Sequence, residues 1–200
     1  MLYSKMPYKI SVVVPTHNER ESVPELHRRL RDVFDRLPDA DFELILCDDS
    51  SDDTPVIVAS LHNEDPRVKL IRLSRRYSQS VAISAGLDHA TGDAAILMDA
   101  DLQDPPEAIP RLLQKWQEGC EVVCVRRPSA GGRFSFYRIL AFLFYRLLTK
   151  LSATPVPVDV GEFRLLDRKV VKILSALPEH TRYLREMTVW PGFRQACIEI

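Results

Sequence analysis

The sequence predicts an α/β fold in which helices cover both faces of a mainly parallel sheet. Short apolar segments alternate along the chain with longer segments whose apolar residues recur at helical spacing. Polar residues directly follow several of the apolar segments, as they do where parallel strands run into ligand-binding loops. With 200 residues, of which 46% are hydrophobic and 28% charged, the chain has the size and composition of one globular domain.

The expected strands and helices alternate along the chain, which is typical of a parallel sheet. The expected strands are residues 10–14, 42–47, 68–73, 94–98 and 121–125. The expected helices begin at Ser22, Thr54, Ser78 and Pro106, and the last three end near His62, His89 and Glu118. The first helix is expected to open with the capping box Ser22-Val23-Pro24-Glu25 and to bury Leu26, Leu30, Val33, Phe34 and Leu37.

Charge and cysteine usage limit the classes of function. Lys and Arg total 27 and Asp and Glu 28, so the net charge of −1 gives no reason to expect a nucleic-acid partner. The four cysteines form no CxxC pair, which favours reduced core thiols and a cytosolic setting. Residues 1–9 lack the apolar stretch of a signal peptide. No window reaches the roughly 18 apolar residues that a membrane span needs.

Acidic residues follow three of the expected strands, and in a parallel sheet these strand ends lie on one rim. The three segments are residues 15–19, 48–53 and 99–104. Asp99 and Asp101 lie two residues apart, which puts both carboxylates on the same side of an extended chain. Their oxygens suit Mg²⁺ or Mn²⁺, with water and substrate phosphates as the remaining ligands. The alternative is that both carboxylates serve turns or helix caps.

Asp48 ends the second expected strand, where an acidic residue contacts the ribose in dinucleotide-binding folds. The alternative is a turn, and Asp52 and Asp53 are assigned to helix capping. The chain has no GxGxxG or GxxxxGK[ST] motif, so a pyrophosphate would be held by a metal ion and arginines. The histidines show no metal-ligand spacing, and the absence of a GxSxG motif disfavours nucleophilic hydrolase chemistry.

Residues 133–152 have the pattern of an amphipathic helix. The segment carries six aromatic residues, and Arg138, Arg146 and Lys150 lie on one side of the expected helix. This arrangement is typical of a helix in a membrane interface, with the basic side toward lipid phosphates. The alternatives are a core helix and a dimer contact.

Several motifs together resemble the family 2 glycosyltransferases, and within them the polyprenyl-phosphate hexosyltransferases, the group of dolichyl-phosphate mannosyltransferase and bacterial undecaprenyl-phosphate glucosyltransferase. The similar segments are VVVPTHNE at 12–19, DDSSD at 48–52, AISAGLDHATGD at 82–93, MDADLQDPPE at 98–107, FYRLL at 144–148, DVGEFRLLDR at 159–168 and WPGF at 190–193. The resemblance reaches about residue 194 and therefore covers nearly the whole chain.

The resemblance implies the GT-A fold and an inverting transfer of a hexose from a UDP- or GDP-sugar to a polyprenyl phosphate. It implies a peripheral protein at the cytoplasmic face of the membrane and leaves a homo-oligomer open. Three parts follow: a nucleotide-sugar-binding core at 1–132, an amphipathic interfacial helix at 133–152, and a C-terminal part of the catalytic domain at 153–200 that is shorter than the family pattern.

The resemblance also implies roles for individual residues. Four residues would surround the base and ribose of the donor: Pro15, Thr16, Glu19 and Asp48. Asp99, Asp101 and Gln103 would hold a Mg²⁺ or Mn²⁺ ion on the diphosphate. Arg127 would lie near the donor phosphates, and Asp159 is the candidate for orienting the acceptor or acting as a base. Asp101, Arg127 and Asp159 are thus the expected catalytic residues.

The sequence departs from the family pattern in the segment 75–78, where Arg-Arg-Tyr-Ser stands in place of R-N-[FY]-G, and at Glu162, which replaces an Asp. Related chains also continue beyond residue 200. Two other functions stay open: a glycosyltransferase with a saccharide or soluble acceptor, and a nucleotide-sugar-binding remnant without transfer. A signalling receiver domain is disfavoured, because Asp-Ala-Asp-Leu-Gln does not supply its lone phosphorylated Asp.

Overall fold

The sheet of this protein has seven strands in the order β3-β2-β1-β4-β6-β5-β7. The structure is a computed structural model and describes residues 7–126, 160–177, 187–188 and 191–200. The elements are β1 (Tyr8–Thr16), α1 (Ser22–Phe34), β2 (Ala40–Asp48), α2 (Thr54–Glu64), β3 (Val68–Arg72), α3 (Gln79–His89), β4 (Ala94–Leu97), the 3₁₀ turn η1 (Pro106–Ala108), α4 (Ile109–Gln117), β5 (Val122–Arg126), β6 (Val160–Asp167), α6 (Arg168–Ala176) and β7 (Gln195–Glu199).

Strand β6 is inserted between β4 and β5 and runs antiparallel to both. The other described strand pairings are parallel. The chain moves outward from β1 through β2 to β3 and then returns to place β4 on the other side of β1. Open α/β sheets bind ligands at such a reversal of strand order, beyond the carboxyl ends of the strands.

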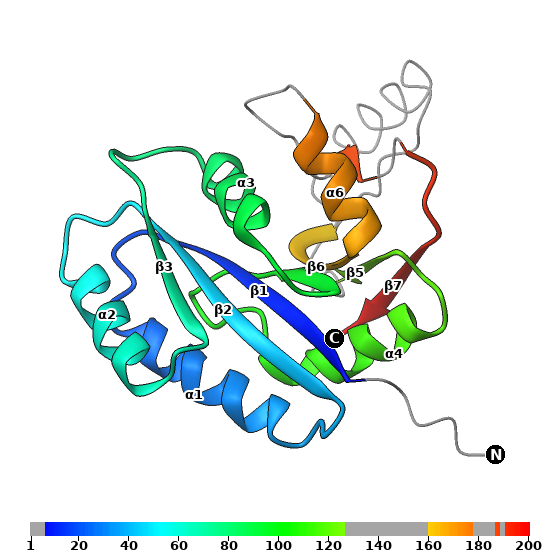
Figure 1. Cartoon of the computed structure of the whole chain (residues 1–200), viewed down its shortest axis with the longest axis horizontal. Coiled ribbons are helices and arrows are strands. Elements are labelled where there is room, and N and C mark those ends of the chain that lie inside the picture. The colour runs from blue at the N-terminus through cyan, green and yellow to red at the C-terminus, as the bar shows by residue number, and fades with distance from the viewer. Residues whose placement is uncertain (1–6, 127–159, 178–186, 189–190) are drawn as a thin grey trace, which may run out of the picture.

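The two faces of the sheet are covered by different helices, as Figure 1 shows. Alternate side chains of β1 divide between the two faces: Val12 and Val14 pack with α1, α2 and α4, whereas Val13 packs with α3 and α6. The strands read as continuous apolar runs because both faces are buried. This arrangement confirms the predicted fold class.

Gly86 lets α3 approach the sheet closely. A β-carbon at this position would lie 2.3 Å from Cγ1 of Val13 and 2.7 Å from Sγ of Cys47. Both neighbours are fully buried, so a side chain here would force them or the helix to shift. Gly86 therefore sets how closely α3 packs against the sheet.

The structure corrects four local predictions. The capping box at Ser22 is wrong: Glu21 occupies the N-cap of α1, and the Ser22 hydroxyl donates instead to Glu19. The helix expected at 106–118 is divided into η1 and α4. Cys197 is exposed, although the four cysteines are free as expected. Asp53 occupies the N-cap of α2, but its side chain makes no capping bond, whereas Asp52, one residue earlier, accepts from the backbone N–H of Thr54 at 3.0 Å.

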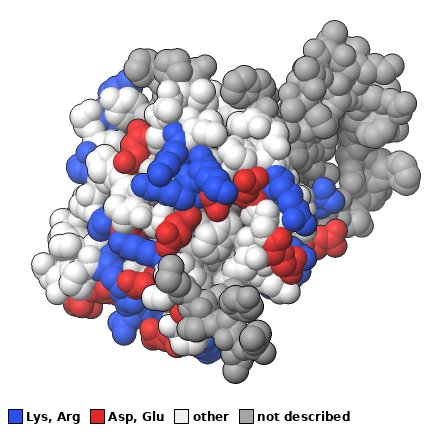
Figure 2. All heavy atoms as spheres, turned by 45° about the vertical axis from the view of Figure 1, so that its right-hand side comes forward, with Lys and Arg blue, Asp and Glu red and all other residues white. Residues whose placement is uncertain are grey.

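The predicted amphipathic helix at 133–152 lies outside the described residues. Within the described ranges, no helix is both long and apolar enough to cross a bilayer. The C-terminal part expected at 153–200 contributes β6 and β7 to the sheet formed by residues 7–126. On the face seen in Figure 2, basic and acidic side chains are interspersed, in keeping with the balanced charge of the chain.

Candidate active site

A cavity of about 270 Å³ lies beyond the carboxyl ends of β1, β2 and β4. This is the place where the order of the strands reverses. The cavity is lined by residues from three strand ends and from the loop that leads into α3: Pro15, Thr16, His17, Glu19, Asp49, Arg76, Tyr77, Ser78, Gln79, Ala82, Asp99, Ala100 and Asp101. The three segments that the sequence placed on one rim therefore meet here.

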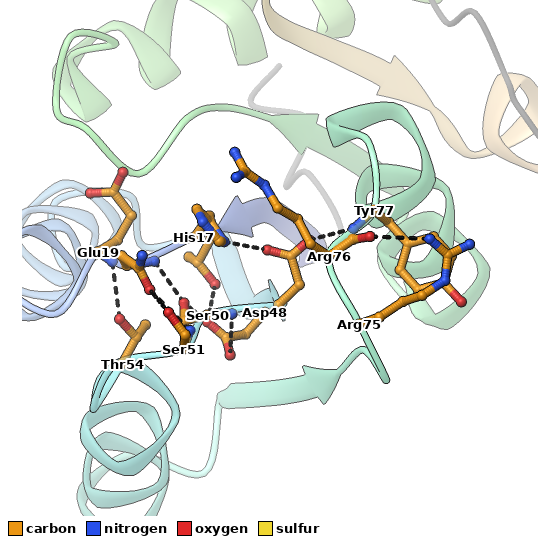
Figure 3. Close-up of polar contacts among 12 residues, drawn as sticks. His17, Glu19, Asp48, Ser50, Ser51, Thr54, Arg75, Arg76 and Tyr77 are labelled. Atoms are coloured by element: carbon orange, nitrogen blue, oxygen red, sulfur yellow. Dashed lines mark hydrogen bonds and ion pairs between the residues drawn. The ribbon is translucent and has the colours of Figure 1, made fainter.

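The turns that follow β1 and β2 are held together by side chain to backbone hydrogen bonds (Figure 3). Asn18 has a φ of 61°, in the left-handed region that asparagine tolerates better than most residues. Its Oδ1 accepts from the backbone N–H of Ser51 at 3.0 Å, and its own N–H donates to Ser50 Oγ at 2.8 Å. The N–H of Glu19 donates to Thr54 Oγ1 at 3.0 Å. These bonds fix the wall of the cavity that carries Glu19.

Asp49 joins this wall to the β3–α3 loop. One carboxylate oxygen of Asp49 lies 2.8 Å from Nδ1 of His17, and the other accepts from the backbone N–H of Tyr77 at 2.8 Å. Asp49 therefore sets the width of the cavity between the end of β1 and the start of α3.

Asp48 occupies a different environment from its neighbour Asp49. It is completely buried and does not line the cavity. Its carboxylate pairs with Arg72 and accepts from the hydroxyl of Thr16 at 3.1 Å and from that of Ser50. It lies on the α1 and α2 side of β2, because it continues the alternation of Leu44 and Leu46. Asp48 thus ties the ends of β1, β2 and β3 together beneath the cavity.

Asp99 is a half-buried acid surrounded by other acids. Burial, followed by repulsion from Asp104, Asp101 and Glu162, raises the pKa of Asp99 to about 6, although the side-chain amide of Gln79 donates to it. A cation would relieve this crowding of negative charge. The residues present therefore fit a divalent ion, for which carboxylate oxygens are the preferred ligands.

The loop after Asp99 is built from short local contacts. Asp101 is exposed to the cavity and accepts from the backbone N–H of Gln103 at 3.0 Å. Leu102 between them has a φ of 62°, an uncommon conformation for a branched side chain and one that clusters at functional sites. In the part of the chain that the structure describes, no group of three or more His, Cys, Asp or Glu residues is arranged to hold a metal. Asp99 and Asp101 are the two carboxylates of this loop that line the cavity and could hold an ion, with water or a ligand completing the coordination.

The structure brings together most of the residues that the sequence nominated. Five line the cavity, namely Pro15, Thr16, Glu19, Asp99 and Asp101, whereas Asp48 and Gln103 do not. Arg127 and Asp159 lie outside the described residues.

The sequence analysis missed several lining residues: His17, Asp49, Arg76, Tyr77 and Gln79. The alternation of side chains along β2 could have identified Asp49. Asp48 lies on the same face as the buried Leu44 and Leu46, so Asp49 is the acid that can face the rim.

A mainly parallel sheet with a polar cavity and an acidic pair at the reversal of its strand order is typical of the α/β proteins that bind ligands at this edge. Residues 11–174 match the family model "Glycosyl transferase family 2", and the chain belongs to this family. It is 40% identical over 190 residues to "Uncharacterized glycosyltransferase YkcC" of Bacillus subtilis, covering 94% of this chain and 58% of that protein. It is 38% identical over 192 residues to the "Bactoprenol glucosyl transferase" of Shigella phage SfX, covering 96% of this chain and 63% of that protein. The chain therefore spans about three-fifths of the length of these relatives.

Solved structures share the fold at low sequence identity. A mannosyltransferase of Pyrobaculum calidifontis in complex with GDP-Man and Mn²⁺ superposes with a TM-score of 0.62 at 21% identity, over 98% of this chain and 56% of that one. Glucosyl-3-phosphoglycerate synthase of Mycobacterium tuberculosis, in complex with Mn²⁺, UDP and phosphoglyceric acid, gives a TM-score of 0.63 at 20% identity, over 96% of this chain and 69% of that one. The fold is that of the GT-A glycosyltransferases, as the sequence predicted.

Proposed function

We propose that this protein transfers a hexose, with inversion, from a UDP- or GDP-sugar to a polyprenyl phosphate. The observation that carries the proposal is the meeting of Asp99 and Asp101 with the wall of Glu19 and Asp49 in one cavity at the reversal of the sheet. The similarity to a bactoprenol glucosyl transferase supports a polyprenyl acceptor. Two proteins of similar fold have structures in complex with GDP-Man or UDP and Mn²⁺, which supports a nucleotide-sugar donor.

The nucleoside of the donor would occupy the side of the cavity formed by the ends of β1 and β2. Pro15, Thr16, Glu19 and Asp49 line this side, and the carboxylate of Asp49 is held by His17. Asp48 contributes from below by fixing these strand ends. The side is prearranged, because its backbone is held by side chains before any ligand binds, which lowers the cost of ordering on binding.

The diphosphate would lie near Asp99 and Asp101, which would hold a Mg²⁺ or Mn²⁺ ion together with phosphate oxygens and water. When bound, such an ion supplies positive charge that stabilises the departing nucleoside diphosphate. Gln79 holds Asp99 from the side of α3, and the turn at Leu102 presents Asp101. The backbone N–H of Gln103 donates to Asp101 in this turn, and the side chain of Gln103 would contact the ion.

In the reaction, an oxygen of the acceptor phosphate forms a bond to the anomeric carbon of the sugar. The bond between that carbon and the donor phosphate breaks, and the electron pair leaves with the nucleoside diphosphate. A phosphate monoester has a second pKa near 6 and is therefore already ionised at neutral pH. No strong base is needed, so Asp159 would orient the acceptor, and Arg127 would neutralise the donor phosphates. The amphipathic segment at 133–152 would bring the site to the cytoplasmic face of the membrane.

The test is transfer of label from the donor to a lipid. Membranes containing the protein are incubated with labelled UDP-glucose or GDP-mannose, Mn²⁺ or Mg²⁺, and undecaprenyl or dolichyl phosphate. We expect label in a lipid product that mild acid cleaves. Label in a water-soluble saccharide would instead support a soluble acceptor. Donor binding without any product would support a nucleotide-sugar-binding protein that lacks transferase activity.

A further inference from the structure

Arg76 differs from the neighbouring arginines of the β3–α3 segment in its contacts. Arg72 pairs with Asp48, and Arg75 stacks its guanidinium group 4.1 Å from the ring centre of Tyr77. Across residues 7–126 and the C-terminal segments that the structure describes, the guanidinium group of Arg76 makes no hydrogen bond or ion pair. Figure 3 shows the side chain extending away from the loop, with no contact drawn at its end.

Arg76 lines the cavity together with four carboxylates, and none of them pairs with it. Each of these acids already has another partner. Asp49 is bonded to His17 and to the backbone of Tyr77, Asp99 to Gln79, Glu19 to Ser22, and Asp101 to the backbone of Gln103. The guanidinium group of Arg76 is therefore not occupied by an acid of the cavity and stays available to a ligand there.

The loop that carries Arg76 is anchored at two points just after this residue. The backbone N–H of Tyr77, the next residue, donates to Asp49 at 2.8 Å. Three residues after Arg76, the side chain of Gln79 donates to Asp99 at 2.5 Å. Arg76 therefore starts from a fixed point on the wall that runs from the proposed nucleoside side to the acidic pair.

We propose that Arg76 binds the diphosphate group of the nucleotide-sugar donor. This inference rests on the proposed function and adds a residue that the family pattern did not nominate, since that pattern has Asn at this position. A guanidinium group forms paired hydrogen bonds with phosphate oxygens and keeps its charge at every physiological pH. Because the leaving diphosphate gains negative charge as the sugar departs, the same contact would assist the reaction as well as binding.

The test compares the charged ligand with its uncharged nucleoside. Binding of UDP, GDP, uridine and guanosine to the full chain is measured by calorimetry in the presence of Mn²⁺. We expect Arg76→Asn to weaken binding of the diphosphate that the protein prefers by about tenfold to a hundredfold, the usual range for a hydrogen bond to a charged group. Binding of the matching nucleoside should stay unchanged, and Arg76→Lys should recover part of the loss.

Arg75→Asn is the matched control. It removes the same charge from the adjacent residue, whose side chain does not line the cavity. It should change the affinity less than about twofold, as a change to an exposed residue outside the ligand site does. Unchanged diphosphate binding in Arg76→Asn, or equal losses for diphosphate and nucleoside, would overturn the assignment of Arg76 alone.

A second arm distinguishes the two sources of phosphate. Farnesyl phosphate in detergent replaces the nucleotide, and binding to the same variants is measured. A loss for farnesyl phosphate without a loss for the nucleoside diphosphate would overturn the donor assignment and place Arg76 on the acceptor. If the unaltered protein binds neither UDP nor GDP with Mn²⁺, the proposed function and the role of Arg76 both fail.

Discussion

Two carboxylates of the same sheet, Glu43 in β2 and Asp99 after β4, lie in opposite electrostatic environments. Glu43 is 1% exposed and accepts from Lys69 at 2.6 Å, from Ser11 at 2.6 Å and from the backbone of Thr91 at 2.7 Å. Burial alone would raise its pKa, but these bonds outweigh burial and hold the pKa of Glu43 far below its usual value. For Asp99, burial and neighbouring acids raise the pKa to about 6.

The difference separates the end of the sheet that stabilises the fold from the end that carries the proposed binding site. The partners of Glu43 come from β1, β3 and the loop before β4, so the acid joins several segments near the amino ends of the strands. Asp99 has an amide partner but no described cation within bonding distance. An acid with a complete set of partners stabilises the fold, whereas an acid among acids lowers stability until a ligand supplies positive charge.

The largest expected effect is at the binding end. Asp101→Asn should reduce Mn²⁺-dependent donor binding and sugar transfer by at least about a hundredfold, because a neutral amide cannot balance the ion that stabilises the leaving group. Calorimetry with Mn²⁺ and the donor, together with the lipid transfer assay, measures both. Asp53→Asn, an exposed acid outside the cavity, is the control and should leave both unchanged. Normal turnover in Asp101→Asn would remove the proposed metal role.

Glu43→Gln should lower the stability of the protein and leave donor binding at the opposite end of the sheet unchanged. Loss of the buried charge leaves Lys9 and Lys69 without their partner, and we expect the free energy of unfolding to fall by about 2–3 kcal/mol. Urea denaturation measures this loss. Glu118→Gln, a change at an exposed acid, should cost less than about 0.5 kcal/mol. Donor affinity should not change in the folded protein; a large loss of affinity with normal stability would contradict the comparison.

Asp48 and Asp49 allow the same comparison between adjacent residues. Asp49→Asn should weaken nucleotide binding by about tenfold, because it alters the carboxylate that faces the cavity and positions His17. Asp48→Asn should mainly lower stability, by about 1–2 kcal/mol, because it removes the charge that pairs with Arg72 beneath the cavity. Calorimetry measures nucleotide affinity and urea denaturation measures stability in both variants. Weaker nucleotide binding in Asp48→Asn, with only a loss of stability in Asp49→Asn, would assign the nucleotide contact to Asp48.

The smallest expected effect is in the pH dependence of stability. The pKa of Glu43 is lower in the folded protein than the unfolded value of 4.5, so its stabilisation is fully present above pH 4.5 and is lost as the pH falls toward the folded pKa. Between pH 4.5 and pH 3 we expect Glu43→Gln to lose about 1 kcal/mol less than the unaltered protein. Urea denaturation across this range measures both slopes. If the stability of the two proteins changes with pH in parallel, folding does not lower the pKa of Glu43.

The parallel half of the fold was predictable because its signals are local. The strands from β1 to β5 are short and largely apolar, and the helices α1 and α4 between them carry apolar residues at helical spacing. The N-terminus of α1 was not predictable, because Ser22 donates to Glu19 of the preceding turn instead of capping its own helix. The place of β6 depends on pairing between segments far apart in the chain, which no local pattern records.

The edge of the sheet that carries the candidate site was predictable, but the arrangement of side chains around the cavity was not. Carboxyl ends of parallel strands must gather at one edge, which placed Thr16, Asp99 and Asp101 near one another. The contribution of His17 depends on its pairing with Asp49, and that of Arg76 on a loop conformation anchored across the cavity. Such contacts arise only after the chain has folded, so the sequence supplies the residues without their arrangement.

The insertion of β6 has a consequence for synthesis of the protein. Among the described strands, β5 pairs only with β6 and β7, which emerge from the ribosome after residues 127–159 have been added. Strands β1 to β4 can assemble earlier, but β4 then exposes an unsatisfied edge on the growing polypeptide. Long-range closure of this kind is slow, so the nascent chain passes through a stage at which its half-built sheet is vulnerable to mispairing and needs shielding.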